Sequence, residues 1–239
     1  MKKSMLAGLV ALGGVAAALA PAEMASATTI TPGSHYRMYT GAGSGSLGDW
    51  KLLGRTTSTD ASFKAAKAGV WVYGDSITRA DYADLAASLT AKGVPSAVDA
   101  QGGLPTLPAV DRLAARVARQ GSPRILLMAT GSNDIFRPTF VGSAATKVRA
   151  LVGPGTKIVW VNTYVKRTRV PATMQTYDLR NSMSVNTAVT TARVNVVVDW
   201  SGFLRAKASR PGAYLSDGVH TTPLGRDARN ALILAKIAP

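Results

Sequence analysis

Cysteine is absent from the 239-residue sequence, and glutamate and histidine are almost absent. Without cysteine there are no disulfide bonds, thiolate nucleophiles or cysteine-ligated metals, so the fold must be held by packing alone. Glu23 is the only glutamate, and His35 and His220 are the only histidines. These side chains leave little from which to build a zinc site, and we expect no metal and no cofactor.

Only one long apolar run is present, and it lies at the N-terminus. Lys2 and Lys3 precede an apolar stretch from Met5 to Ala20, and the small-residue triplet Ala25–Ala27 follows. This order is typical of a secretory signal peptide at residues 1–27, and an uncleaved membrane anchor is the alternative. We therefore expect a bacterial protein that is secreted or associated with the cell envelope and has no membrane span after cleavage.

Basic residues outnumber acidic ones throughout the chain. The formal net charge is +15, and removal of residues 1–27 leaves 26 basic and 12 acidic residues, a net charge of +14. The basic residues are scattered apart from Lys166, Arg167 and Arg169, and no nucleic-acid-binding motif accompanies them, so we expect no nucleic-acid partner. For an exported protein the charge indicates attraction to anionic cell-envelope polymers or lipid headgroups. A merely solubilising surface is the alternative.

Residues 28–68 have no apolar period, and their first half is rich in threonine, glycine and serine. We interpret them as an extension or linker that precedes a single domain at residues 69–239. They include a G-x-G-x-x-G pattern at Gly43, Gly45 and Gly48. Because no buried strand precedes this pattern and no convincing helix follows it, the sequence does not predict a dinucleotide site.

From Gly69 onward, short β-branched or apolar runs alternate with helix-like stretches. The five runs are Val70–Tyr73, Ser96–Asp99, Ile125–Ala129, Ile158–Asn162 and Val194–Asp199. The intervening stretches are amphipathic, with Val110, Leu113 and Val117 on one helical face as an example. This alternation predicts an α/β fold of parallel strands covered by helices on both faces. Ligands in such sheets bind at the carboxyl ends of the strands, near the point where the strand order reverses.

A serine follows the first of these runs. Gly74, Asp75 and Ser76 end the run, and a helix-like stretch with Leu85 and Leu89 comes next. We expect Ser76 on a tight turn between strand and helix, where its hydroxyl is exposed and free N–H groups of the helix N-terminus stabilise developing negative charge. The alternative is an N-capping serine in a glycine turn.

Two further turns after predicted strands carry candidate oxyanion donors. Asn133, in the run Gly131–Asp134, follows the third strand and can donate a side-chain N–H, with an Asx turn as the alternative. Gly102 and Gly103 follow the second strand. A glycine lets a backbone N–H approach a ligand closely, although glycine pairs are also common in plain turns.

The histidine count leaves one candidate base. His35 lies in the unpatterned extension, whereas His220 follows the fifth predicted strand and precedes Pro223, which is typical of a helix start. Asp217 stands three residues before His220, a spacing that can bring its carboxylate to one ring nitrogen while the other faces the serine. A structural histidine is the alternative. The coincidence of nucleophile, oxyanion donors, acid and base favours a catalytic triad of Ser76, His220 and Asp217.

These residues together resemble the SGNH/GDSL hydrolase superfamily over residues 69–239. Its four sequence blocks are matched by Ser76, by Gly103 or alternatively Gly102, by Asn133, and by the pair Asp217 and His220. The resemblance implies a flavodoxin-like three-layer α/β/α sandwich with a five-stranded parallel sheet. It also implies that Ser76 attacks an ester carbonyl, while the N–H groups of Ser76 and Gly103 and the Asn133 side chain hold the oxyanion. The G-x-S-x-G elbow of the larger α/β-hydrolases is missing.

The expected function is therefore a secreted serine esterase that hydrolyses O-acyl esters of a small molecule or a polysaccharide through an acyl-enzyme. Residues 159–163 and 198–200 also resemble, more loosely, the SGNH domains of cell-wall O-acyltransferases. A transferase uses the same acyl-enzyme and differs only in its acceptor. A cell-wall O-acetyltransferase and a non-catalytic binder of anionic wall polymers remain the alternatives. Substrate specificity is expected in the loops at residues 135–145 and 164–180.

Overall fold

The computed structural model describes residues 50–192 and 194–237. The expected signal peptide, the glycine pattern at residues 43–48 and His35 lie outside the described residues. Among the described residues, no helix is both long and apolar enough to cross a membrane.

All five predicted strands are present in one sheet. They are β2 (Val70–Gly74), β3 (Ser96–Gln101), β4 (Ile125–Ala129), β5 (Lys157–Val161) and β6 (Val196–Val198). A sixth strand, β1 (Arg55–Thr57), completes the sheet in the order β1-β3-β2-β4-β5-β6. Strands β2 to β6 run parallel, whereas β1 pairs antiparallel with β3. The fold is thus a mostly parallel sheet of six strands rather than the five predicted.

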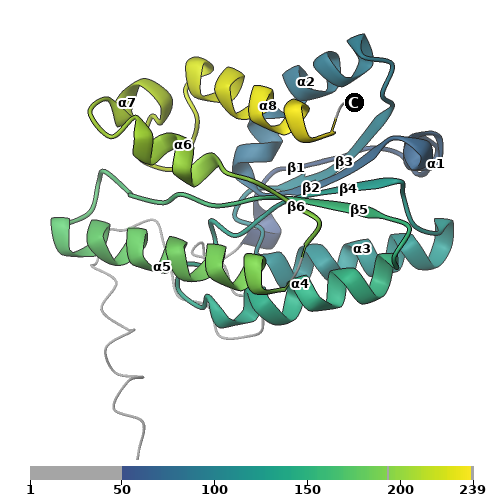
Figure 1. The fold of residues 1–239 in the computed structure, drawn as a ribbon, viewed down its shortest axis with the longest axis horizontal. Coiled ribbons are helices and arrows are strands. Elements are labelled where there is room, and N and C mark those ends of the chain that lie inside the picture. Colours follow the sequence, from purple (N-terminus) through teal and green to yellow (C-terminus); the bar gives the residue numbers. More distant parts are fainter. Residues whose placement is uncertain (1–49, 193, 238–239) are drawn as a thin grey trace, which may run out of the picture.

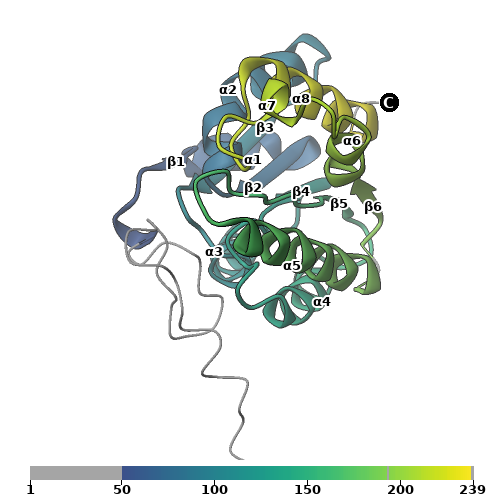
Figure 2. The same ribbon diagram turned by 90° about the vertical axis from the view of Figure 1, so that its left-hand side faces the viewer.

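Helices cover both faces of the sheet, as predicted (Figure 1). They are α1 (Asp60–Ala65), α2 (Ser76–Ala91), α3 (Thr106–Gln120), α4 (Thr139–Val152), α5 (Ala172–Thr191), α6 (Trp200–Ala206), α7 (Pro211–Tyr214) and α8 (Pro223–Ile237). Figure 1 shows α3, α4 and α5 below the sheet and α2, α6 and α8 above it, and Figure 2 shows the same layers after a quarter turn. The result is a three-layer α/β/α sandwich.

Each helical layer encloses one apolar core against the sheet. Trp71 of β2 and Trp160 of β5 belong to the core between the sheet and the layer of α3, α4 and α5. Val72 of β2 and Leu127 of β4 belong to the core between the sheet and the layer of α2, α6 and α8. Strands β2 and β4 are buried along their whole length, which explains why they read as continuous apolar runs rather than alternating ones.

The folded unit begins earlier than the sequence predicted. Residues 50–68, which we interpreted as part of an extension, contribute a short 3₁₀ helix (Trp50–Leu52), β1, α1 and a second 3₁₀ helix (Ala66–Ala68). Phe63 of α1 is fully buried, and its carbonyl accepts a 2.8 Å hydrogen bond from Nε1 of Trp71. The domain boundary predicted at residue 69 therefore falls inside the folded unit.

The strand order creates the crevice in which the site lies. From β2 the chain crosses to β3 on one side and later to β4 on the other, so the order reverses at β2. The connections that leave the carboxyl ends of β2, β3 and β4 diverge there and open a space between them. Ser76, the glycine pair and Asn133 all lie in these connections.

Candidate active site

Ser76 occupies the first residue of α2, directly after β2. Asp75 is the N-cap, and its buried carboxylate accepts a 3.0 Å hydrogen bond from the backbone N–H of Ile77. A Cβ on Gly74 would lie 2.3 Å from the Thr78 side chain, so the turn from strand to helix requires glycine there. The N–H groups of a first helical turn have no intrahelical acceptor, which leaves the N–H of Ser76 available to a ligand.

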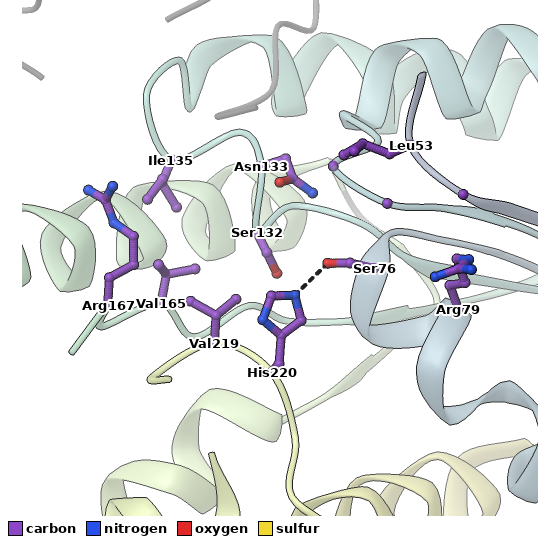
Figure 3. Close-up of a pocket in the computed structure, with 13 residues that line it drawn as sticks. Leu53, Ser76, Arg79, Ser132, Asn133, Ile135, Val165, Arg167, Val219 and His220 are labelled. Atoms are coloured by element: carbon purple, nitrogen blue, oxygen red, sulfur yellow. Dashed lines mark hydrogen bonds between the residues drawn. The ribbon is translucent and has the colours of Figure 1, made fainter. Parts of the chain in front are cut away.

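The structure brings Ser76, His220 and Asp217 together, although 144 residues separate the serine from the histidine. Figure 3 shows the contact between Ser76 and His220. Ser76 Oγ lies 2.9 Å from Nε2 of His220, and Nδ1 of His220 lies 2.8 Å from Oδ2 of Asp217. Oδ1 of Asp217 accepts hydrogen bonds from the backbone N–H groups of Val219 and His220 at 2.9 and 2.8 Å. With Nδ1–H donated to the carboxylate, Nε2 is the acceptor for the serine hydroxyl.

The charges and hydrogen bonds around His220 and Asp217 favour a protonated imidazole beside an ionised carboxylate. The hydrogen bond to Asp217 raises the pKa of His220 above its usual value, against the effect of partial burial, and the charges of Asp75 and Asp81 raise it further. Burial raises the pKa of Asp217, but the hydrogen bonds from the His220 side chain and the backbone outweigh burial and lower it well below its usual value. Asp217 therefore stays ionised and stabilises an imidazolium on His220.

Backbone pairing holds the Asp217 loop in place. The N–H groups of Lys166 and Thr168 donate to the carbonyls of Gly218 and Asp217, both at 2.9 Å. Gly218 has a φ of 85°, and a Cβ at this residue would lie only 1.7 Å from the Lys166 carbonyl oxygen. Glycine is therefore required for the close approach of these two loops.

Two buried groups fasten the His220 loop to the helix that carries Ser76. The Thr221 hydroxyl donates a 2.8 Å hydrogen bond to Oδ1 of Asp81 on α2. The other oxygen of Asp81 lies 3.5 Å from Nη1 of Arg229 on α8. Asp81 and Arg229 are both almost fully buried, so this contact between α2 and α8 is shielded from solvent.

The two glycines of the pair differ in whether the backbone N–H is already engaged. The N–H of Gly102 donates a 3.0 Å hydrogen bond to the carbonyl of Gly54, whereas Gly103 turns away from β3 with a φ of 65°. Both glycines and Asn133 line the same pocket as Ser76 and His220. Because the Gly102 N–H is already engaged, the geometry favours Gly103 over Gly102 as the oxyanion donor.

The turn that carries Asn133 is fixed by its neighbour Asp134. The buried carboxylate of Asp134 accepts hydrogen bonds from the backbone N–H and the hydroxyl of Thr106, at 3.0 and 2.7 Å, at the start of α3. Burial raises the pKa of Asp134 to about 7, although the hydrogen bonds from Thr106 oppose this rise. The Thr106 hydroxyl also lies 2.9 Å from the Thr130 hydroxyl, and it has only one proton to donate. A protonated Asp134 can donate to Thr106 and so leave that proton for Thr130.

The pocket in front of Ser76 has a volume of about 200 Å³ and two contrasting sides. Ile135, Val165 and Val219 lie on one side of Ser76, next to Arg167, and these three apolar side chains pack in one cluster with Ile77 (Figure 3). Arg79 lies on the other side of Ser76 in Figure 3. No cluster of three or more metal-binding side chains occurs within the described residues.

Sequence reasoning missed two side chains that line this pocket, Leu53 and Arg79. Arg167 also lines it and comes from the 164–180 loop, in which specificity was expected, and its guanidinium forms a buried ion pair with Asp178 at 2.7 Å. Arg79 follows Ser76 by three residues on a helix, which is the spacing of side chains on one helical face. This spacing was the one signal in the sequence that could have placed Arg79 beside the serine.

No protein-family model and no curated protein sequence matches the chain, but many solved structures share its fold. A lipase/acylhydrolase from Enterococcus faecalis is 19% identical, with a TM-score of 0.58, over 72% of this chain and 95% of that one. A member of the lipolytic G-D-S-L family from Veillonella parvula is 15% identical, with a TM-score of 0.57, over 70% and 97%. The C-terminal catalytic domain of peptidoglycan O-acetyltransferase A from Streptococcus pneumoniae is 15% identical, with a TM-score of 0.55, over 72% and 93%.

These likenesses show that the chain has the SGNH/GDSL hydrolase fold, as its sequence blocks predicted. This fold is shared by ester hydrolases and by an acyltransferase domain. Fold alone does not define a reaction, so the function must be argued from the residues of the site.

Proposed function

We propose that the protein is an exported serine esterase that hydrolyses O-acyl esters through an acyl-enzyme on Ser76. The observation that carries this proposal is the continuous hydrogen-bonded chain from Ser76 through His220 to Asp217, at 2.9 and 2.8 Å. An isolated serine hydroxyl is a weak nucleophile, and an adjacent base that is oriented by a carboxylate is the arrangement that activates it. Export is proposed from the leader-like residues 1–27.

In this mechanism Ser76 Oγ attacks the ester carbonyl and its proton passes to Nε2 of His220. The carbonyl oxygen becomes an oxyanion, which accepts hydrogen bonds from the N–H groups of Ser76 and Gly103 and from the Asn133 amide. When the tetrahedral intermediate collapses, the C–O bond to the alcohol breaks and His220 returns the proton to the leaving oxygen. Water then attacks the acyl-enzyme by the same steps and releases the acid.

A cell-wall O-acetyltransferase is the second candidate, and the likeness to the catalytic domain of peptidoglycan O-acetyltransferase A favours it. In that reaction a sugar hydroxyl rather than water attacks the acyl-enzyme. The two candidates are separated by adding chitooligosaccharide to a reaction with 4-nitrophenyl acetate. An esterase releases acetate in step with nitrophenol, whereas a transferase releases less acetate and forms O-acetylated sugar.

The first prediction concerns the nucleophile. A fluorophosphonate probe should label the mature protein at Ser76, because such reagents report serines that an adjacent base activates. Peptide mass spectrometry locates the label, and Ser76→Ala should remove it. Ser132→Ala is the matched control, since Ser132 lines the same pocket but its hydroxyl bonds to Thr163 instead of an imidazole. Labelling that survives in Ser76→Ala would place the nucleophile elsewhere.

The second prediction concerns the net charge of +14 expected for residues 28–239. The mature protein should co-sediment with an anionic wall polymer such as a polyglycerol phosphate, and binding should fall steeply as salt rises from about 0.05 to about 0.5 M. Neutral dextran is the control polymer. Binding that is absent at low salt, or that salt leaves unchanged, would reduce the charge to a solubility feature.

A further inference from the structure

Among the described side chains of the pocket, Arg79 stands out because no ion pair compensates its charge. The described residues that line the pocket include two arginines and no aspartate. Arg167 is neutralised by its buried ion pair with Asp178. Within the described residues, Arg79 is exposed and takes part in no ion pair. Among the described residues that line the pocket, Arg79 is therefore the cation beside the serine that no ion pair neutralises.

The position of the Arg79 guanidinium is set by two features of the fold. Ser76 and Arg79 are three residues apart on α2, so their side chains leave the same helical face with Cβ atoms about 5–6 Å apart. The guanidinium lies against the backbone of Gly54, where a Cβ would come within 2.6 Å of Nη2. Because Gly54 has no side chain, the charged group can rest at the rim of the pocket instead of pointing into bulk solvent.

The two sides of the pocket suit two different parts of an ester. Ile135, Val165 and Val219 offer apolar surface to an acyl group. Figure 3 shows Arg79 on the opposite side of Ser76 from these three side chains. When an acyl group occupies the apolar side, the alcohol part of the ester extends toward Arg79. A guanidinium there can form a bidentate, charge-assisted pair with a carboxylate or phosphate group.

We propose that Arg79 makes this pocket selective for esters whose alcohol part carries an anionic group, a carboxylate or a phosphate. This inference rests on the proposed esterase function and narrows its substrate class to acylated anionic compounds, including acylated acidic polymers. The acyl group itself is uncharged. The excess of basic residues in the chain also favours anionic substrates, because it raises their concentration near the protein.

The test compares matched acetate esters that differ in the charge of the alcohol. The anionic esters are 4-acetoxybenzoate and 4-acetoxyphenyl phosphate, and 4-acetoxybenzamide is the neutral partner. The quantity measured is the ratio of kcat/KM for an anionic ester to kcat/KM for the neutral one, each corrected for its rate of alkaline hydrolysis. We expect this ratio to be about ten for at least one anionic ester. This is the size of effect that a charge-assisted hydrogen bond gives at a partly exposed site.

Two variants and one control locate the effect. Arg79→Ala should bring the ratio close to one, and Arg79→Lys should retain part of it, because lysine keeps the charge but loses the bidentate fork. Lys92→Ala removes the same charge from the far end of α2 and should leave the ratio unchanged. The preference of the parent protein should also shrink as salt increases.

The outcomes separate this inference from the function on which it rests. If the neutral ester is hydrolysed in a Ser76-dependent manner but the ratio is near one, or stays high in Arg79→Ala, the inference is wrong and the esterase stands. If none of the three esters is hydrolysed, the proposed function itself fails. A preference for phenyl hydrogen glutarate, whose charge lies on the acyl part, over the anionic alcohol esters would overturn the assignment of the two sides.

Discussion

Replacing His220 with alanine should lower kcat/KM for 4-nitrophenyl acetate by about 10⁴-fold or more, the scale seen when the base of a triad is removed. The parent activity should rise with pH as His220 loses its proton, since only the neutral imidazole accepts the serine proton. Because the hydrogen bond to Asp217 raises the pKa of His220, the midpoint should lie above the ordinary imidazole value of about 6.5. Initial rates between about pH 5 and 9 measure both effects.

The other histidine and the carboxylate provide the controls. His35→Ala should keep both the rate and the titration. Asp217→Asn should bind substrate almost normally but turn over about 10⁴-fold more slowly, because the amide spoils the tautomer and the stabilisation of the imidazolium. Its remaining activity should titrate at a lower pH than that of the parent protein. An inactive His35→Ala together with an active His220→Ala would show that the assigned triad is wrong.

Replacing Asp134 with asparagine should change how stability depends on pH. The pKa of Asp134 is about 7 in the folded protein, against about 3.9 in an unfolded chain, so the native state prefers the protonated acid. The stabilisation that protonation of Asp134 gives the parent protein is fully present below about pH 4. It is lost as pH rises through about 7. Asparagine does not ionise and keeps its contribution at every pH. As pH rises from about 4 to about 7, the variant should therefore gain up to about 4 kcal/mol of stability relative to the parent.

Urea unfolding at several pH values measures this difference. Other titrating groups are common to both proteins and cancel when the two free energies of unfolding are subtracted. Asp111→Asn is the control, because Asp111 is exposed and its ion pair with Lys147 lies on the surface. The free energy of unfolding of this variant should stay within about 0.5 kcal/mol of that of the parent protein. A difference between Asp134→Asn and the parent that is flat across this range would mean that Asp134 stays ionised in the folded protein.

The sequence predicted the parallel part of the sheet but not its edge. Strands β2 and β4 are buried on both faces and consist of uninterrupted apolar residues, a signal that needs no knowledge of their neighbours. The three residues of β1 are all exposed and polar, so no periodic pattern marks them. β1 is held by backbone pairing with β3 and by the ion pair of Arg55 with Asp99. Both contacts join residues more than 40 positions apart.

The candidate site, too, could be predicted only in part from the sequence. The sequence predicted that Ser76, Asp217 and His220 lie together, because histidine is rare and because each residue follows a predicted strand. The choice between Gly102 and Gly103 could not be made in that way, since it depends on a hydrogen bond to Gly54, which the sequence placed in a linker. The net charge of the pocket could not be predicted either, because the ion pair that neutralises Arg167, with Asp178, forms only in the folded protein.

The contact between α2 and α8 makes the 2.9 Å distance between Ser76 Oγ and His220 Nε2 depend on two helices. Ser76 begins α2, and His220 lies three residues before α8 begins. Thr221, Asp81 and Arg229 join the two helices. Heat that separates α8 from α2 would lengthen the gap between hydroxyl and imidazole while the sheet, paired strand to strand, is still intact. We therefore expect activity to disappear on heating before the sheet melts, and the thermal limit of function to report local opening rather than global unfolding.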